Sequence, residues 1–142
     1  MIDKIKVGIS QKLNVLFGDE YRIYTEEIKQ GLKPPAFFIK TLNPSQTQIL
    51  GRRYQRTYPF DIHFFPSENG AEAEQCESIT DQLFSELEYI TVDGNLTRGT
   101  GMNAEVVNGV LHFFIQYNSY VLKPETPQEY MDDITQSSYI KR

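Results

Sequence analysis

The chain has 142 residues, of which 39% are hydrophobic and 23% charged, as in ordinary globular proteins and unlike disordered ones. Its net charge of −5 argues against binding of nucleic acid by the whole surface, because such binding depends on Lys and Arg that neutralise phosphates. The single cysteine excludes an internal disulfide and a zinc site made of paired cysteines, and it favours a cytosolic protein. No stretch reaches the roughly 20 apolar residues needed to span a bilayer, and the charged N-terminus is unlike a signal peptide.

The first part of the chain is predicted to form one helix and two strands. Residues 2–17 have apolar side chains at spacings of three and four, which indicates an amphipathic helix. Gly18 is its expected end, since glycine readily adopts the left-handed conformation that follows a last helical turn. The segment EYRIYTEEI, from Glu20, is expected to be a modest strand, and residues 36–42 a second strand after two prolines.

The stretch from Arg52 to Pro66 is the predicted central strand. Its aromatic and aliphatic residues recur with the two-residue period of a strand that is buried on one face. Arg52 and Arg56 lie on the same face, so we expect the first half of this strand to leave the core as an arm that needs a partner. A break or bulge is expected at Pro59, which has no N–H group to donate to a ladder.

Residues 43–51 begin with an Asn-Pro turn signal and contain little that could anchor a core. They are expected to be the tip of a long hairpin or a mobile loop. Because they join strand 36–42 to the arm, we expect these three segments to form one projecting hairpin.

The second half of the chain is predicted to contain a helix and a hairpin. Residues from about 71 to 90 have helical spacing. The apolar stripe of this helix consists of Cys76, Ile79, Leu83, Leu87 and Ile90. The dipeptide Asn108-Gly109 is a strong signal for a two-residue turn that joins the last two strands. Gly99 and Gly101 lack the context of a phosphate loop and indicate a strand irregularity or a close approach of backbones.

These elements predict an α+β fold with the order α-β-β-β-α-β-β. Two helices are expected to cover one face of a mostly antiparallel sheet. We predict that residues 1–123 form a single domain and that residues 124–142 are a polar C-terminal tail.

The residues most suited to chemistry give no catalytic pattern. Asp61 and His63 share one side of the central strand, as an orienting carboxylate and a base would, but no local motif places a nucleophile beside them. His112 is expected at a surface or an interface, and Cys76 as a small buried hydrophobe. The pair Asp132-Asp133 is expected to be solvated and not to hold a divalent ion. We therefore predict no catalytic residue, no metal site and no cofactor.

One constellation is predicted to be functional, namely Arg52, Arg53, Tyr54, Arg56 and Tyr58. Arginine and tyrosine together are typical of protein interfaces and of platforms for single-stranded nucleic acid. Because the chain is acidic, we favour a protein interface. The alternatives are a module for single-stranded nucleic acid or RNA that uses Arg52, Tyr54 and Arg56, a solvated hairpin without function, and an enzyme built on Asp61 and His63.

The run PPAFFIKTLNPSQTQILGRRYQRTYPFDIHFFP, with the predicted order of elements, resembles the tail terminator proteins of tailed bacteriophages and of related prophages in Gram-positive bacteria. The resemblance is strongest from about residue 21 to 65 and continues more loosely to Tyr120. It implies a small non-enzymatic α+β subunit that assembles as a ring, usually of six copies, on the head-proximal end of the tail tube.

The resemblance also implies partners. Such a ring stops polymerisation of the tube and offers a docking surface to the head connector, so the expected partners are other copies of the chain, the tail tube protein and the head-connector protein. DNA is expected to pass through the ring lumen without specific binding, and no membrane is expected. The resemblance implies that the long hairpin and the edge of the sheet make the subunit contacts, and we expect the five residues named above to lie at the subunit or tube interface. The expected locations are the host cytoplasm during assembly and then the virion tail.

Overall fold

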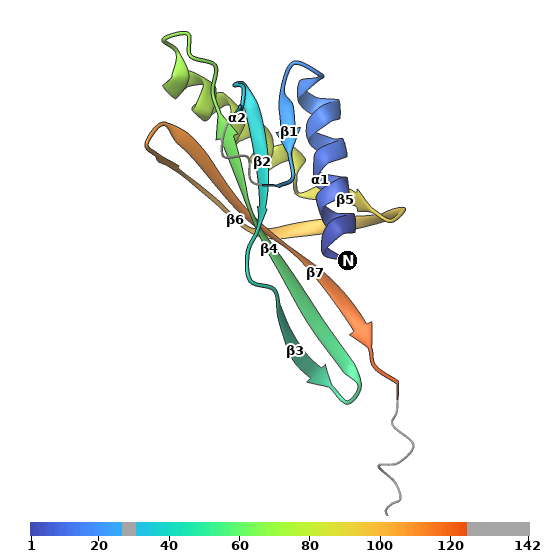
Figure 1. Cartoon of the computed structure of the whole chain (residues 1–142). Helices are drawn as coiled ribbons and strands as arrows, with labels where there is room; N and C mark the ends of the chain where they lie inside the picture. Colours follow the sequence, from blue (N-terminus) through green and yellow to red (C-terminus); the bar gives the residue numbers. More distant parts are fainter. Residues whose placement is uncertain (27–30, 125–142) are drawn as a thin grey trace, which may run out of the picture. The chain divides into compact units, whose positions relative to one another are not determined.

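The computed structural model describes residues 1–26 and 31–124. These residues form two helices and seven strands (Figure 1). In chain order the elements are α1 (Ile2–Phe17), β1 (Arg22–Tyr24), β2 (Ala36–Thr41), β3 (Ser45–Leu50), β4 (Arg53–Phe65), α2 (Glu72–Glu86), β5 (Tyr89–Val92), β6 (Asn95–Val107) and β7 (Val110–Leu122). None of the described helices has the length and apolar character that crossing a membrane requires.

The chain divides into two compact units. The body comprises Met1–Ser45 and Thr57–Ser119. The second unit, which we call the ribbon, comprises Gln46–Arg56 and Tyr120–Arg142, of which residues 46–56 and 120–124 are described. The predicted polar tail lies outside the described residues from position 125 onward, as does the end of the predicted strand EYRIYTEEI.

The strands are ordered β1-β2-β4-β7-β6-β5, and β3 also pairs with β4. Strands β1 and β2 are parallel. The pairs β2–β4, β5–β6 and β6–β7 are antiparallel. The prediction of an α+β fold with a mostly antiparallel sheet is therefore confirmed, with two strands more than we expected.

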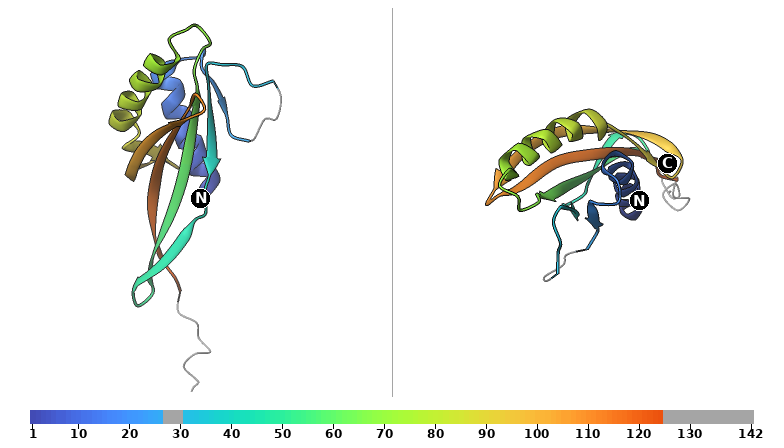
Figure 2. Two further views of the ribbon diagram at one scale, coloured as in Figure 1. Left: turned by 90° about the vertical axis from the view of Figure 1, so that its left-hand side faces the viewer. Right: turned by 90° about the horizontal axis from the view of Figure 1, so that it is seen from above.

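One face of the body's sheet carries the hydrophobic core, and both helices contribute to it. On β4 the core residues are Phe60, Ile62 and Phe64, which are all 0% exposed. Phe64 contacts Phe37 of β2, and Phe37 in turn lies 5.2 Å from Phe17 of α1 between ring centroids. Phe84 of α2 contacts Phe113 of β7 edge-on, with ring centroids 5.2 Å apart. Helix α2 lies alongside β6 and β7 in both views of Figure 2.

Helix α1 begins and ends as its spacing predicts. Gly18 has φ of 82°, so the chain leaves the helix through a conformation that glycine adopts easily. Within the helix, Gly8 is buried against β5. A Cβ atom at this position would lie 2.6 Å from the carbonyl oxygen of Thr91, so the absence of a side chain allows the helix to pack directly on the strand.

The second helix is shorter than predicted. Helix α2 ends at Glu86, and Tyr89–Val92 form the separate strand β5. Ile90 belongs to this strand and is 2% exposed. The prediction that the helix continues to residue 90 was wrong. Ile90 follows Leu83 and Leu87 at helical spacing, but in the structure Leu83 lies in α2, Leu87 caps its end and Ile90 lies in β5, and all three side chains reach the same core.

Two expectations about the central hairpin also need correction. Residues Ser45–Leu50, expected to be a tip or a loop, form β3, and all six of them are exposed. A strand without a buried face has no hydrophobic alternation by which it could be recognised. Strand β4 continues through Pro59 without a break. The Pro59 carbonyl accepts from the Leu42 N–H just past the end of β2, and because the N–H and C=O groups of a strand residue point to the same side, the missing donor faces the place where β2 has ended.

The two-residue turn at the last hairpin is confirmed. Val107 pairs with Val110, and the residues between them, Asn108 and Gly109, have φ of 52° and 79°. Both values suit the tight turns that match the twist of paired strands. The irregularity expected near Gly99 and Gly101 is also present, since the β6–β7 register shifts between Thr100 and Asn103.

Replacing Gly109 with valine should lower the free energy of unfolding by about 1 kcal/mol or more. Apart from Gly109 and its two chain neighbours, no atom of the described residues lies within 4 Å of the Cβ position, so the cost arises from forcing a β-branched residue to positive φ and not from a clash. Urea denaturation followed by circular dichroism measures the change. Gly109→Asn is the matched control and should cost much less, because asparagine tolerates this conformation. An unchanged midpoint for the valine variant would contradict the turn.

Candidate functional site

The ribbon joins two segments that are far apart in the sequence. The backbone N–H of Lys123 donates to the carbonyl oxygen of Arg52 at 2.9 Å, and Nη1 of Arg52 lies 3.4 Å from the carbonyl oxygen of Lys123. Within the hairpin, Nε of Arg56 donates to Oε1 of Gln46 at 2.8 Å. The end of β7 is thus held beside the beginning of β4.

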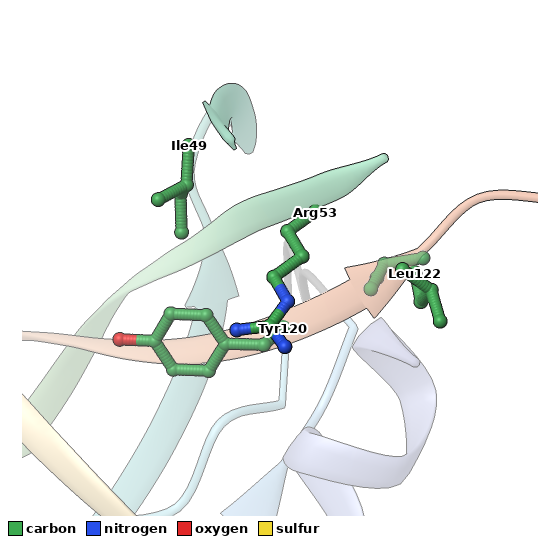
Figure 3. Close-up of a pocket in the computed structure, with 5 residues that line it drawn as sticks. Ile49, Arg53, Tyr120 and Leu122 are labelled. Atoms are coloured by element: carbon green, nitrogen blue, oxygen red, sulfur yellow. The ribbon is translucent and has the colours of Figure 1, made fainter. Parts of the chain in front are cut away.

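An open pocket of about 360 Å³ lies on the ribbon. It is lined by Ile49, Arg53, Tyr120, Val121 and Leu122 (Figure 3). Ile49, Tyr120 and Leu122 are 52%, 70% and 61% exposed, which is unusual for large apolar side chains gathered in one place. Arg53 extends from β4 toward Tyr120 on β7. Exposed apolar groups that adjoin polar ones are typical of interaction surfaces.

The ribbon is cationic although the chain is acidic. Its described residues include Arg52, Arg53, Arg56 and Lys123 and contain no Asp or Glu, whereas the whole chain has a net charge of −5. Among residues 1–26 and 31–124, no carboxylate forms an ion pair with any of these four cations. The positive charge of the ribbon is therefore not neutralised by any carboxylate among these residues.

The opposite charge is concentrated on α2. This helix contains five acidic residues and no Lys or Arg. Glu74, Glu77 and Asp81 are exposed on its surface. One chain therefore carries a basic and an acidic surface on different elements.

The structure separates Tyr58 from the other predicted interface residues. Tyr58 is 6% exposed and belongs to the hydrophobic core of the body, so its side chain offers little surface to a partner. Tyr54, by contrast, lies in the ribbon, where Nζ of Lys123 is 4.2 Å from the centroid of its ring. This cation–π contact occupies one face of the Tyr54 ring.

A second cluster of polar side chains lies in the body, on the sheet face opposite the core. Oδ2 of Asp61 is 3.0 Å from Nε2 of His63 and 3.1 Å from Nδ1 of His112. Burial alone would raise the pKa of Asp61, but the hydrogen bonds and positive charge of the two imidazoles outweigh it and hold the pKa below its ordinary value. The sequence placed Asp61 and His63 on one side of the strand correctly, and the structure adds His112.

Other candidate residues have structural positions. Cys76 is 3% exposed, as expected of a small buried hydrophobe, and burial raises the pKa of its thiol. The hydroxyl of Tyr117 donates to the carbonyl oxygen of Leu87 at 2.7 Å, and burial raises its pKa as well. The pair Asp132-Asp133 lies outside the described residues.

Comparison with family models gives a match to the family described as phage tail terminator protein, over residues 4–129. The chain belongs to the phage tail terminator family. No curated protein matches it in sequence. A solved structure that is similar to it has 12% sequence identity, covers 87% of this chain and 96% of its own, and gives a TM-score of 0.38, which is too low to support any conclusion.

Membership of the phage tail terminator family makes the chain a structural protein of the phage tail and confirms the family that the sequence resembles. For this tail terminator, the sequence pattern named the three arginines and Tyr54, and the structure places Tyr120, Leu122 and Lys123 in the same ribbon. Tyr120 and Leu122 are at the end of β7, and Lys123 follows it. The alternation of this strand is explained by burial in the core, so no pattern in the sequence indicates that its end lies beside the hairpin.

Proposed function

We propose that this tail terminator assembles as a ring of six copies on the head-proximal end of the tail tube, stops tube polymerisation and provides the surface on which the head connector docks. Its partners are then other copies of the chain, the tail tube protein and the head-connector protein, while DNA passes through the lumen without specific binding. Assembly takes place in the cytoplasm of the host, a Gram-positive bacterium that carries the phage or prophage, and the product is part of the virion tail.

The observation that carries this proposal is the combination of a cationic, partly apolar ribbon with an acidic helix in one chain. The ribbon presents Arg52, Arg53 and Arg56 without carboxylate partners among the described residues, and α2 presents Glu74, Glu77 and Asp81. Surfaces of opposite charge on one protein favour contact between copies, because the basic surface of one copy can bind the acidic surface of the next.

A contact between two different surfaces of identical copies is heterologous, and repeated heterologous contacts close into a ring when the rotation between neighbours permits it. We therefore infer that the ribbon of one subunit binds along α2 of the next. Leu50, which is 75% exposed, and the pocket around Ile49 and Leu122 would supply the apolar part of the contact. Cationic side chains of the ribbon that do not contact α2 would be free to bind the tail tube protein.

The alternative, a module for single-stranded nucleic acid, has weaker support. Stacking of bases needs an accessible aromatic face. On the ribbon, one face of Tyr54 already contacts the ammonium group of Lys123 at 4.2 Å, and Arg56 is held by Gln46. A nucleic-acid complex should also weaken steeply as salt is raised, whereas a contact with an apolar part should weaken less.

Reversing the charge at Arg52 and Arg56 should leave a folded monomer that does not form rings. An exposed arginine contributes little to monomer stability, whereas loss of one partner of a buried interfacial charge pair costs about 2–5 kcal/mol, and a ring repeats that loss at every contact. Phage particles that carry Arg52→Glu with Arg56→Glu should have overlong tails or tails detached from heads. Electron microscopy of the particles and sedimentation of the purified variant measure the two effects.

Two matched variants test the assignment of α2. Arg22→Glu with Lys33→Glu makes the same change of charge at exposed positions of the body and should assemble normally. Glu77→Arg with Asp81→Arg should block assembly alone but restore rings when combined with the ribbon variant. Failure of this rescue would remove α2 from the contact, normal tails made by a folded ribbon variant would remove the ribbon, and normal tails after deletion of the gene would remove the terminator role.

A further inference from the structure

We propose that Asp61, His63 and His112 form a binding site for a divalent transition-metal ion, with Zn²⁺ as the ion best suited to it. Sequence analysis predicted no metal site, because His112 lies on a different strand and 51 positions away from Asp61. The site lies in the body and uses none of the ribbon residues.

The spacing of the ligand atoms fits a metal ion. One oxygen of Asp61 lies 3.0 Å and 3.1 Å from the nearest ring nitrogens of the two histidines, and one ligand atom from each of the three residues lies within 4.8 Å of the others. Zinc binds imidazole nitrogen and carboxylate oxygen at about 2.0–2.2 Å, so two ligands on a tetrahedral ion are about 3.3 Å apart. Small rotations of the side chains would therefore bring the three atoms onto one ion.

The backbone holds these ligands on rigid elements. Asp61 and His63 are alternate residues of β4, so their side chains point to the same face. His112 comes from β7, which is the neighbour of β4 in the sheet. The two imidazole rings are 4.2 Å apart between centroids. Such placement on neighbouring strands reduces the conformational entropy that would be lost when the ion binds.

The surroundings are those of a protected site. The side chains of Asp61, His63 and His112 are 10%, 16% and 21% exposed. Aromatic rings flank them. Between ring centroids, Phe38 lies 5.3 Å from His63 and Phe114 lies 6.4 Å from His112. Limited access of water strengthens the attraction between the carboxylate and a cation.

Asp61 also has an unpartnered atom. Asp61 is only 7% exposed, and its Oδ1 is buried and has no hydrogen-bond partner among the described residues. A buried carboxylate oxygen without a partner is costly. A hydrogen-bonded cluster of one aspartate and two histidines accounts for Oδ2 but not for Oδ1, whereas an ion bound in the cluster can be shared by both oxygens.

Three protein ligands leave one position of a tetrahedral ion for water or for a further group. Glu105 is the residue directly opposite His112 in the β6–β7 ladder, and its side chain is exposed. Lys40 is opposite Asp61 in the β2–β4 ladder and is also exposed, so it can turn away from a cation. The ion would join β4 to β7 across the centre of the sheet.

Isothermal titration calorimetry of the full chain, made without a histidine tag, tests the proposal with ZnCl₂. The expected result is one Zn²⁺ per chain, with affinity lowered by more than about 100-fold in His63→Ala and His112→Ala. Mutation of residues that only hydrogen-bond to a metal ligand already lowers metal affinity by about 10–100-fold, and loss of a ligand itself should cost more. Zn²⁺ should also raise the melting temperature of the wild type, because it binds the folded state. Co²⁺ should give the intense visible absorption of a tetrahedral site.

The wild type alone provides a decisive measurement. The ¹⁵N resonances of both imidazole rings should shift on addition of Zn²⁺, whether or not the variants fold. Cys76→Ser and the pair Asp132→Asn with Asp133→Asn are matched controls and should bind as the wild type does. Unshifted imidazole resonances, or full binding by a folded variant that lacks both histidines, would overturn the proposal.

Discussion

Replacing Phe64 with alanine should lower the free energy of unfolding by about 3–5 kcal/mol. Phe64 is 0% exposed and stacks among aromatic rings, with centroids at 5.1 Å from Phe37 and 6.2 Å from Tyr21. Alanine leaves a cavity that the neighbouring rings and strands cannot fill. Since a domain of this size is stable by about 5–15 kcal/mol, this loss is a large part of the total, and the melting temperature should fall markedly.

The matched change in the same strand is Tyr54→Ala. Tyr54 lies in the ribbon and contacts Lys123, so its loss should cost about 1 kcal/mol or less in the monomer, while ring formation should suffer. Chemical denaturation of both variants, with sedimentation of the second, separates these effects. Equal losses of stability would show that the division of β4 into a core half and a ribbon half is wrong.

Replacing Gly8 with alanine should destabilise the protein by about 1–3 kcal/mol, although alanine is the better helix former by about 1 kcal/mol. The added methyl group would lie 2.6 Å from the carbonyl oxygen of Thr91. That oxygen belongs to the backbone of β5, so it cannot move aside as a flexible side chain could. Helix α1 must shift away from the strand and lose contacts at Ile5 and Ile9.

Gln11→Ala is the control for helix propensity. It makes a comparable change at an exposed position of α1 and should leave stability unchanged or slightly higher. Thermal unfolding of the two variants in parallel gives the comparison. A Gly8→Ala variant as stable as Gln11→Ala would mean that α1 and β5 are not in direct contact.

The parts of the fold that could be predicted from the sequence are helices and strands with one buried face, and turns with characteristic residues. Helix Ile2–Phe17, the core half of β4 and the hairpin at Asn108-Gly109 all have periodicity or turn chemistry that is local. Strand β3 has no buried residue and therefore no period. Strand β5 was assigned to the preceding helix because both contribute side chains to one core, and spacing alone does not distinguish them.

The same distinction applies to the candidate site residues. Arg52, Arg53 and Tyr54 are neighbours in sequence, so they could be recognised together as an interface pattern. Lys123 joins them only because β7 ends beside the start of β4, and His112 joins Asp61 only because β7 is the neighbour of β4 in the sheet. Pairing between distant strands depends on the whole sheet, and no local pattern contains it.

The place of β7 between β4 and β6 also bears on how the protein is made in the cell. Strand β4 leaves the ribosome roughly 60 residues before β7 is complete, which at about 5–20 residues per second leaves it without that neighbour for about 3–12 s. During this interval one edge of the central strand, with its buried aromatic face, is open to other nascent chains. Nascent chains that lie close together can pair through this edge before β7 is made, so chaperones and growth temperature should influence the yield of native subunit.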